Sequence, residues 1–256
     1  MFENRIKTQV AAGEAAWGLA LPDASEFLAK TLINIGIDFL WIDLEHRPYD
    51  VERIRWLPLF CRQKGCVPLV RVAGLDSQLI KKALDIGASA IMVPQVNNAE
   101  EARRAVQYAK YPPAGTRGIT PMWTSLMDVP LQDYLDHAND ETCMVVQIES
   151  VEGMENLDEI AQVEGVDVMF AGPMDLSAAF GHIGQTKHPE VLEYLAEFPS
   201  RVAKYGKASG VTFQTFEECQ WAHEKGYRFI AFGNAFQVVA QHLGADLQRG
   251  RGLDKA

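Results

Sequence analysis

CMVVQIESVEGMENLDEIAQVEGVDVMFAGPMDLS, residues 143–177, is the stretch that predicts the fold most directly. It contains two apolar runs, 144–148 and 166–171, that are rich in Val and Ile and too short for helices, which is typical of buried parallel strands. A helical segment, 153–161, separates the two runs. The stretch therefore predicts a strand–helix–strand unit, the repeating unit of a parallel sheet.

An acidic residue follows each of these two strands. Glu149 comes directly after the first strand, and Asp175 follows the second after Gly172, Pro173 and Met174. Because the carboxyl ends of neighbouring parallel strands meet at one edge of a sheet, the two carboxylates are expected to converge. Converging oxygen ligands suit Mg²⁺ or Mn²⁺, and the open positions of such a cation could take a 2-oxo acid. The alternative is two solvated loop residues, as Asp and Glu usually are.

Strand and helix patterns alternate along the whole chain. Eight such units within 256 residues, without a break in composition, predict one (β/α)8 barrel domain over residues 1–256. An open doubly wound sheet is the alternative, but no G-x-G-x-x-G motif follows the first strand. The other predicted strands cover 17–21, 39–43, 67–72, 90–93, 210–214 and 229–233, and an irregular insert covers 111–139.

Several helix ends can also be predicted. Asp23, Asp50, Asp76 and Asn98 each precede a helical pattern and are expected to be N-caps. A last helix is predicted from about residue 235 to 247, followed by a charged, frayed tail over 248–256.

Composition excludes some classes of partner. The net charge of −10 argues against nucleic acid and against an anionic membrane surface, since both bind basic surfaces. The four cysteines form no C-x-x-C pair, so free thiols in the reducing cytoplasm are expected. No apolar run is long enough to span a membrane, and the N-terminus does not resemble a signal peptide.

The barrel rule adds candidate site residues, because reaction sites lie at the carboxyl ends of barrel strands. His46 follows the second strand and has a pKa suited to a general base, although a surface histidine is the alternative. Arg71 ends the third strand and could stabilise developing negative charge, or simply pair with a neighbouring acid. Gln147 lies near the end of the fifth strand. The backbone N–H groups of Met174 and Asp175 open a helix and could bind a carboxylate.

Six motifs run through nearly the whole chain. They are IDLEHRPYD (42–50), PLVRV (68–72), GASAIMVPQVNNAEEARRAV (87–106), YPPAGTRGI (111–119), VVQIESVEGMENLDEIAQVEGVDVMFAGPMDLSAAFG (145–181) and HPEV (188–191). In content and order they resemble the class II, metal-dependent pyruvate aldolases of the 4-hydroxy-2-oxo-heptanedioate aldolase family, relatives of the citrate lyase β-subunit group.

The resemblance implies reversible cleavage of a 4-hydroxy-2-oxo acid into pyruvate and an aldehyde, with a divalent cation as cofactor. Mg²⁺ or Mn²⁺ is expected, and Co²⁺ is a third candidate. The resemblance also implies a (β/α)8 barrel in a homohexamer, a trimer of dimers, with the last helix exchanged between subunits. The implied roles are metal binding by Glu149 and Asp175, substrate binding by Gln147, Gly172, Met174 and Asp175, and catalysis by His46, Arg71 and Asp85.

Asp85 is implied to raise the basicity of His46, yet it precedes the fourth strand and belongs at the amino-terminal edge of its own barrel. We therefore predict that it reaches His46 of a neighbouring subunit. The chain also departs from the family pattern at 119–127, ITPMWTSLM, where an arginine that shapes the aldehyde pocket is missing. This departure favours an apolar or sugar-like aldehyde over one derived from a dicarboxylate.

Two alternatives to the aldolase hypothesis use the same residues. An oxaloacetate decarboxylase, or a synthase that condenses an enolate (macrophomate-synthase-like or citrate-synthase-like), would need the same metal chelate. A barrel that binds a 2-oxo acid without catalysis is the alternative of another class.

Overall fold

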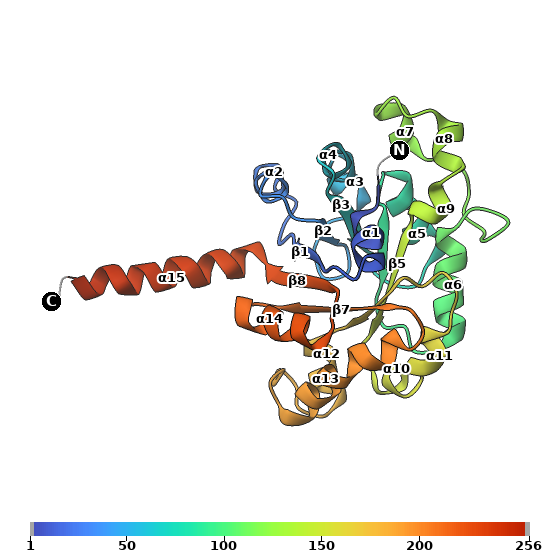
Figure 1. Ribbon diagram of the computed structural model, residues 1–256. Coiled ribbons are helices and arrows are strands. Elements are labelled where there is room, and N and C mark those ends of the chain that lie inside the picture. The colour runs from blue at the N-terminus through green and yellow to red at the C-terminus, as the bar shows by residue number, and fades with distance from the viewer. Residues whose placement is uncertain (1–2, 254–256) are drawn as a thin grey trace.

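The computed structural model describes residues 3–253 and contains a closed barrel of eight parallel strands in the order β1 to β8 (Figure 1). This architecture confirms the predicted (β/α)8 barrel. The strands are β1 (Ala16–Ala20), β2 (Phe39–Asp43), β3 (Val67–Arg71), β4 (Ala90–Val93), β5 (Cys143–Ile148), β6 (Val168–Ala171), β7 (Ala208–Phe213) and β8 (Phe229–Asn234).

Helices surround this barrel and connect its strands. They are α1 (Arg5–Ala11), α2 (Glu26–Asn34), α3 (Val51–Ile54), α4 (Leu57–Gln63), α5 (Ser77–Asp85), α6 (Ala99–Ala109), α7 (Met122–Leu126), α8 (Leu131–Leu135), α9 (Ala138–Glu141), α10 (Val151–Glu155), α11 (Leu157–Ala161), α12 (Pro173–Ala179), α13 (Pro189–Ala203), α14 (Phe216–Lys225) and α15 (Ala235–Leu253). The described helices include none that is long and apolar enough to cross a membrane.

Side chains alternate between two cores along each strand. In β2, Phe39 and Trp41 belong to the cluster inside the barrel, whereas Leu40 and Ile42 pack between the barrel and its helices. This alternation follows from the two-residue period of a strand. It also means that Asp43, two residues after Trp41, points inward at the carboxyl end of the barrel.

The barrel interior is filled by aromatic rings that need space from glycine. The rings of Phe39 and Phe229 stack with centroids 4.2 Å apart. A Cβ atom added to Gly18 would lie 2.3 Å from the Phe39 ring, and one added to Gly210 would lie 2.9 Å from the rings of Phe170 and Phe229. Glycine at these two positions therefore allows a solid, ring-filled interior, so no channel connects the two ends of the barrel.

The amino-terminal end of the barrel is covered by α1, which the sequence patterns did not predict. Ile6 is fully buried in the interior cluster. Asn4, the N-cap of α1, donates from Nδ2 to the backbone oxygens of Ser89 at 2.8 Å and Glu141 at 2.9 Å, just before β4 and β5 begin. The carboxyl end is left as the open end.

Some predicted helix ends were right and others wrong. Asp50, Asp76 and Asn98 are N-caps as predicted. The N-cap of α2 is Ser25 rather than Asp23, whose carboxylate instead accepts a hydrogen bond from the Ser25 backbone N–H at 2.8 Å. The single helix predicted over 153–161 is two helices, because Asn156 lies between them and donates its side chain to the Asn97 backbone oxygen at 2.9 Å.

The insert and the C-terminus also differ from expectation. The region 111–139 holds α7, α8 and the start of α9, with a small core around Trp123 and Tyr134. α15 continues to Leu253, beyond the predicted end at residue 247, and residues 254–256 of the predicted tail lie outside the described part. α15 extends away from the barrel as one long helix (Figure 1).

Candidate active site

An arginine–aspartate pair lies at the carboxyl end of the barrel interior. Asp43 and Arg71 are direct neighbours in the register of β2 and β3. The guanidinium donates from Nε to Asp43 Oδ1 at 2.9 Å and from Nη2 to Oδ2 at 2.8 Å, and it lies over the Trp41 ring at 4.8 Å. Both side chains are buried, so this two-point ion pair fixes the direction of Arg71. The sequence left open whether Arg71 is paired with an acid, and it is.

Asp43 remains charged in this environment. Burial acts against its charge, but the hydrogen bonds and the positive charge of Arg71, with two backbone N–H groups, lower the pKa of Asp43 below its usual value. Asp43 was not among the predicted site residues. Its two-residue spacing from the inward-facing Trp41 was the signal that would have revealed it.

Glu45 forms a second contact with the same arginine. Its Oε2 lies 2.9 Å from Arg71 Nη1 and 3.6 Å from His46 Nε2. Burial is the main cause that raises the pKa of Glu45, against the positive charge of Arg71. The His46 side chain itself is 65% exposed. Glu45 therefore connects the buried arginine to a histidine that can reach solvent and substrate.

Glu149 is buried and held on both of its oxygens. The backbone N–H of Gln95 donates to Oε1 at 3.0 Å, and Nε2 of Gln147 donates to Oε2 at 2.9 Å. The backbone of Gln95 adopts a positive φ of 51°, which is uncommon for residues other than glycine. Burial first, and then the negative charge of Asp175, raise the pKa of Glu149 to about 7.

The turn after β6 brings Asp175 towards Glu149. Asp175 lies in the first turn of α12, which Gly172 and Pro173 begin, and its side chain is exposed. A Cβ atom added to Gly172 would lie 2.6 Å from Glu149 Oε2, so only glycine leaves the Glu149 carboxylate in place. The charge of Asp175 contributes to the raised pKa of Glu149, and the convergence of the two acids on one metal ion stays a prediction.

Asp85 lies at the opposite end of the barrel. Its Oδ1 is 3.1 Å from Nη2 of Arg117, which also donates from Nη1 to the Tyr134 hydroxyl at 3.1 Å. Burial is the main cause that raises the pKa of Asp85, although Arg117 acts to lower it. The structure thus brings seven of the predicted site residues to one end of the barrel and separates Asp85 from them.

The segment 119–127, which differs from the family pattern, lies at the amino-terminal end of the barrel, as Asp85 does. Trp123 packs against Gly87, in the turn before β4, and the guanidinium carbon of Arg62 lies 4.0 Å from the Trp123 ring centroid. This segment therefore does not line the site of its own chain. It can influence an acceptor only in the site of another subunit.

A cavity of about 460 Å³ opens beside the arginine–aspartate pair. Its lining includes the buried Asp43 and Arg71, the exposed Lys187 and the partly buried Glu218. Lys187 Nζ lies 2.8 Å from Glu218 Oε1. Neither of these two residues was predicted, because neither follows directly on a strand end or belongs to a motif with a known role.

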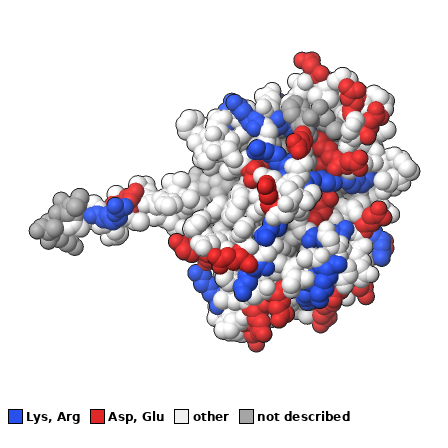
Figure 2. Space-filling model, viewed as in Figure 1, with Lys and Arg blue, Asp and Glu red and all other residues white. Residues whose placement is uncertain are grey.

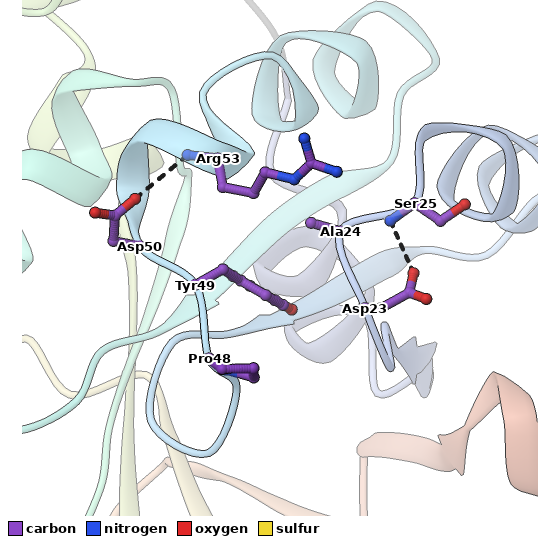
Figure 3. A pocket seen from close by; sticks show the side chains of 7 residues that line it. All are labelled: Asp23, Ala24, Ser25, Pro48, Tyr49, Asp50 and Arg53. Atoms are coloured by element: carbon purple, nitrogen blue, oxygen red, sulfur yellow. Dashed lines mark hydrogen bonds between the residues drawn. The ribbon is translucent and has the colours of Figure 1, made fainter.

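A second hollow lies between the loops after β1 and β2 (Figure 3). Its acids are already used as local hydrogen-bond acceptors: Asp23 binds the Ser25 backbone N–H, and Asp50 binds the Arg53 backbone N–H at 3.4 Å. Burial raises the pKa of Tyr49 to about 12, so its hydroxyl stays protonated. Because Arg71 and Asp43 line the first cavity and do not line this hollow, we assign the chemistry to the cavity beside Arg71.

The chain is similar to known aldolases over almost its full length. It is 39% identical to hydroxypyruvate/pyruvate aldolase of Pseudomonas aeruginosa, over 94% of this chain and 90% of the relative. It is 38% identical to 4-hydroxy-2-oxo-heptane-1,7-dioate aldolase of Escherichia coli, over 95% and 96% of the two chains. The aldolase-type carbon–carbon lyase expected from the sequence is confirmed by these relatives.

The barrel itself has a near match among solved structures. The crystal structure of an HpcH/HpaI aldolase/citrate lyase family protein from Burkholderia cenocepacia J2315 superposes with a TM-score of 0.90 and 31% identity, covering 97% of this chain and 99% of that one. Residues 17–241 match the HpcH/HpaI aldolase/citrate lyase family as a whole. Similarity on this scale shows that the chain belongs to the HpcH/HpaI aldolase/citrate lyase family.

Proposed function

We propose that this aldolase uses a divalent cation, Mg²⁺ or Mn²⁺ with Co²⁺ as a third candidate, to cleave a 4-hydroxy-2-oxo acid reversibly into pyruvate and an aldehyde. The observation that carries the proposal is the buried Glu149 carboxylate. Its pKa is raised to about 7 by burial and by the negative charge of Asp175. Two acids held together in this way repel each other unless a proton or a cation lies between them.

The donor set fits a hard divalent cation. The Gln95 N–H and the Gln147 amide each bind one oxygen of Glu149, which orients the carboxylate while each oxygen keeps a further lone pair. Asp175 supplies a second, exposed carboxylate, whose charge acts on Glu149. Carboxylate oxygens that leave several positions to water and substrate are the usual ligands of Mg²⁺.

When bound, the cation would withdraw electron density from the carboxylate and carbonyl of the 2-oxo acid and so favour the enolate. The chain's own residues would place the substrate. Gln147 lies beside Glu149, and the N–H groups of Met174 and Asp175 lie in the first turn of α12, where a helix leaves such groups free to bind an anion.

Arg71 would stabilise the negative charge that develops on the carbonyl oxygen. Asp43 holds two of its nitrogens, so Nη1, which faces Glu45 and lies 3.5 Å from Gln147 Oε1, is the edge directed to the substrate side. His46 would take the proton of the 4-hydroxyl group, directly or through a water, because it lies exposed on the same rim.

Asp85 would assist His46 only across a subunit interface. It lies at the amino-terminal end of its own barrel, paired with Arg117, so a neighbouring chain must supply it. We propose a homohexamer, a trimer of dimers in which α15 packs on a partner. The projecting α15 and its exposed Phe236, Val239 and Leu243 support this arrangement.

The test is pyruvate release by metal-stripped protein after addition of Mg²⁺, Mn²⁺ or Co²⁺, with a panel of 4-hydroxy-2-oxo acids. We expect chelation to abolish activity, and Glu149→Gln to lower metal-supported activity at least about 100-fold. Glu152→Gln, which changes an exposed acid three residues away, is the matched control. A Glu149→Gln protein that keeps full metal-dependent activity would refute the assignment. Oxaloacetate alone, in parallel, distinguishes decarboxylation from aldol cleavage.

A further inference from the structure

A second group of metal-type ligands lies outside the site described above. His182, His188 and Glu190, at the junction of the 180–188 loop with α13, bring one donor atom each to within 4.8 Å of one another. His182 Nε2 lies 2.7 Å from Glu190 Oε2, and His188 Nδ1 lies 3.9 Å from the same oxygen. Within residues 3–253, no other three His, Cys, Asp or Glu side chains meet this closely.

The two imidazole rings are held face to face. Their centroids are 3.4 Å apart and their planes differ by 22°. His188 Nδ1 is buried and makes no hydrogen bond among the described residues, since 3.9 Å to Glu190 is too long for one. A buried ring nitrogen without a hydrogen bond is unfavourable, and a cation shared with His182 and Glu190 would satisfy it.

The loop that carries these residues is fixed by backbone hydrogen bonds. The N–H of His182 donates to the Ser177 backbone oxygen at 2.7 Å, and the N–H of Gly184 donates to Ser177 Oγ at 2.9 Å. The N–H of Gln185 donates to the His182 oxygen at 2.8 Å, and the N–H of His188 donates to the Gln185 oxygen at 2.9 Å. Only the side chains would need to move to close around an ion.

We propose that His182, His188 and Glu190 form a binding site for a borderline divalent cation of the Zn²⁺ class. Two imidazole nitrogens and one carboxylate oxygen are a typical three-residue zinc set that leaves one position open. Ligands of a tetrahedral Zn²⁺ lie roughly 3.3 Å apart. His188 Nδ1, now 3.9 Å from Glu190 Oε2, would move closer to that oxygen, and His182 Nε2, now 2.7 Å from it, would move slightly away. The site differs in chemistry from the all-oxygen pair proposed for the reaction, and it does not depend on that proposal.

The position of the cluster gives a bound cation a structural consequence. Thr186 and Lys187 lie between the two histidines in sequence and line the cavity that contains Arg71. A cation that joins His182 to Glu190 would close this segment into a loop and brace this wall of the cavity. The cluster is therefore a brace beside the reaction site rather than a part of its chemistry.

The experiment is a titration of metal-free, full-length protein with Zn²⁺ or Co²⁺ against a chromophoric chelator. It is carried out on the wild type and on Glu149→Ala, which removes the proposed reaction metal. We expect one tight Zn²⁺ equivalent per chain in Glu149→Ala, the same equivalent in the wild type beside metal at the proposed reaction site, and an affinity at least about 100-fold lower when His182→Ala is added to Glu149→Ala. Bound Co²⁺ should show the visible absorption of a site with nitrogen ligands, and Mg²⁺ in excess should not displace it.

Two further variants make the result decisive. Glu190→Gln changes an exposed ligand with little effect on shape, so it keeps the test valid should His182→Ala fail to fold. His242→Ala removes an exposed histidine on α15 and should bind Zn²⁺ like the wild type. If the tight equivalent persists when His182→Ala and Glu190→Gln are each added to Glu149→Ala, or is absent from Glu149→Ala itself, the proposed site is wrong.

Discussion

At the scale of single residues, Asp43 determines how Arg71 is presented. Both side chains are buried, and two hydrogen bonds join them. Replacing Asp43 by Asn leaves the guanidinium with Glu45 as its remaining ionic partner. Because breaking a buried ion pair costs about 3–5 kcal/mol, and Glu45 remains, we expect Asp43→Asn to lower the free energy of unfolding by about 3 kcal/mol at neutral pH.

The same variant should alter the acid end of the stability profile. The pKa of Asp43 is lowered in the folded protein, so its contribution is present above the unfolded value of 3.8 and is lost as the pH falls through the lower folded value. Urea unfolding between pH 6 and about pH 3 measures this difference. The wild type and Asp43→Asn should differ most near neutral pH and converge at the acid end. Parallel curves across the range would contradict this account.

Gly172 offers a test of the proposed metal site that leaves its ligands unchanged. An added Cβ would lie 2.6 Å from Glu149 Oε2, so Gly172→Ala must displace the carboxylate. We expect the affinity for Mg²⁺ to fall about 10- to 100-fold, as is common when groups that orient a ligand are changed. Gly118→Ala is the matched control, because its Cβ would meet Lys81 at an ordinary 3.7 Å. Calorimetric titration of the two metal-stripped variants measures the effect.

The sequence predicted residues at this scale where strand periodicity constrains them. Glu149 comes directly after a predicted strand, and Asp175 follows the next strand after Gly172, Pro173 and Met174. The two-residue period within the second strand would also have given Asp43. The sequence could not predict that Glu45 lies between Arg71 and His46. That position depends on how the loop after β2 folds back. The fold of this loop is determined by hydrogen bonds from the backbone N–H groups of Glu45 and His46 to the Asp43 carboxylate.

At the scale of elements, α15 is a long helix that projects from its own barrel (Figure 1). Phe236, Val239, Leu243 and Leu247 are each at least half exposed and repeat at helical spacing. Figure 2 shows few charged side chains along this helix before its far end. An apolar stripe on a projecting helix is typical of an interface between chains.

This stripe gives a prediction about assembly. The double variant Val239→Asp with Leu243→Asp places two charges on the stripe and should shift the protein from the proposed hexamer to smaller species. Gln248→Asp adds one charge to an exposed position of the same helix, off the stripe, and should leave the mass unchanged. Light scattering after size-exclusion chromatography measures the mass. A wild-type mass for the double variant would exclude α15 from the interface.

Helices and their ends could be predicted where the local sequence determined them. They could not be predicted where contacts between residues distant in the sequence determined them. The caps Asp50, Asp76 and Asn98 act within their own helices, so local sequence sufficed. α1 has a weak apolar pattern, and it is held by hydrogen bonds from Asn4 to Ser89 and Glu141, which are far away in the sequence. Such contacts exist only after the barrel has closed.

At the scale of the whole molecule, the two ends of the barrel carry different parts of the proposed machinery. His46 lies at the carboxyl end, and Asp85 with the 119–127 segment lies at the other. Because the barrel interior is filled, the two ends of one chain cannot cooperate directly. Cooperation requires the amino-terminal end of one subunit to face the carboxyl end of another.

Mixing variants tests this arrangement. Asp85→Ala and His46→Ala proteins should each be weakly active, and their mixed assemblies should recover roughly a quarter of wild-type activity, since an intact site then combines groups from two chains. Mixing His46→Ala with Glu149→Gln is the control. Both of these residues belong to the site of one chain, so that mixture should recover nothing. No recovery in the first mixture would mean that Asp85 does not act across subunits.

The carboxylates around Arg71 affect the order in which the cation and the 2-oxo acid bind. Asp43, Glu45, Glu149 and Asp175 together outnumber the two guanidinium groups near them, those of Arg71 and Arg47. A 2-oxo acid carries a further negative charge and is repelled from such a site at short range. We expect the cation to bind first and the acid second. The supply of free divalent metal, more than the concentration of the acid, would then determine whether the enzyme works at all.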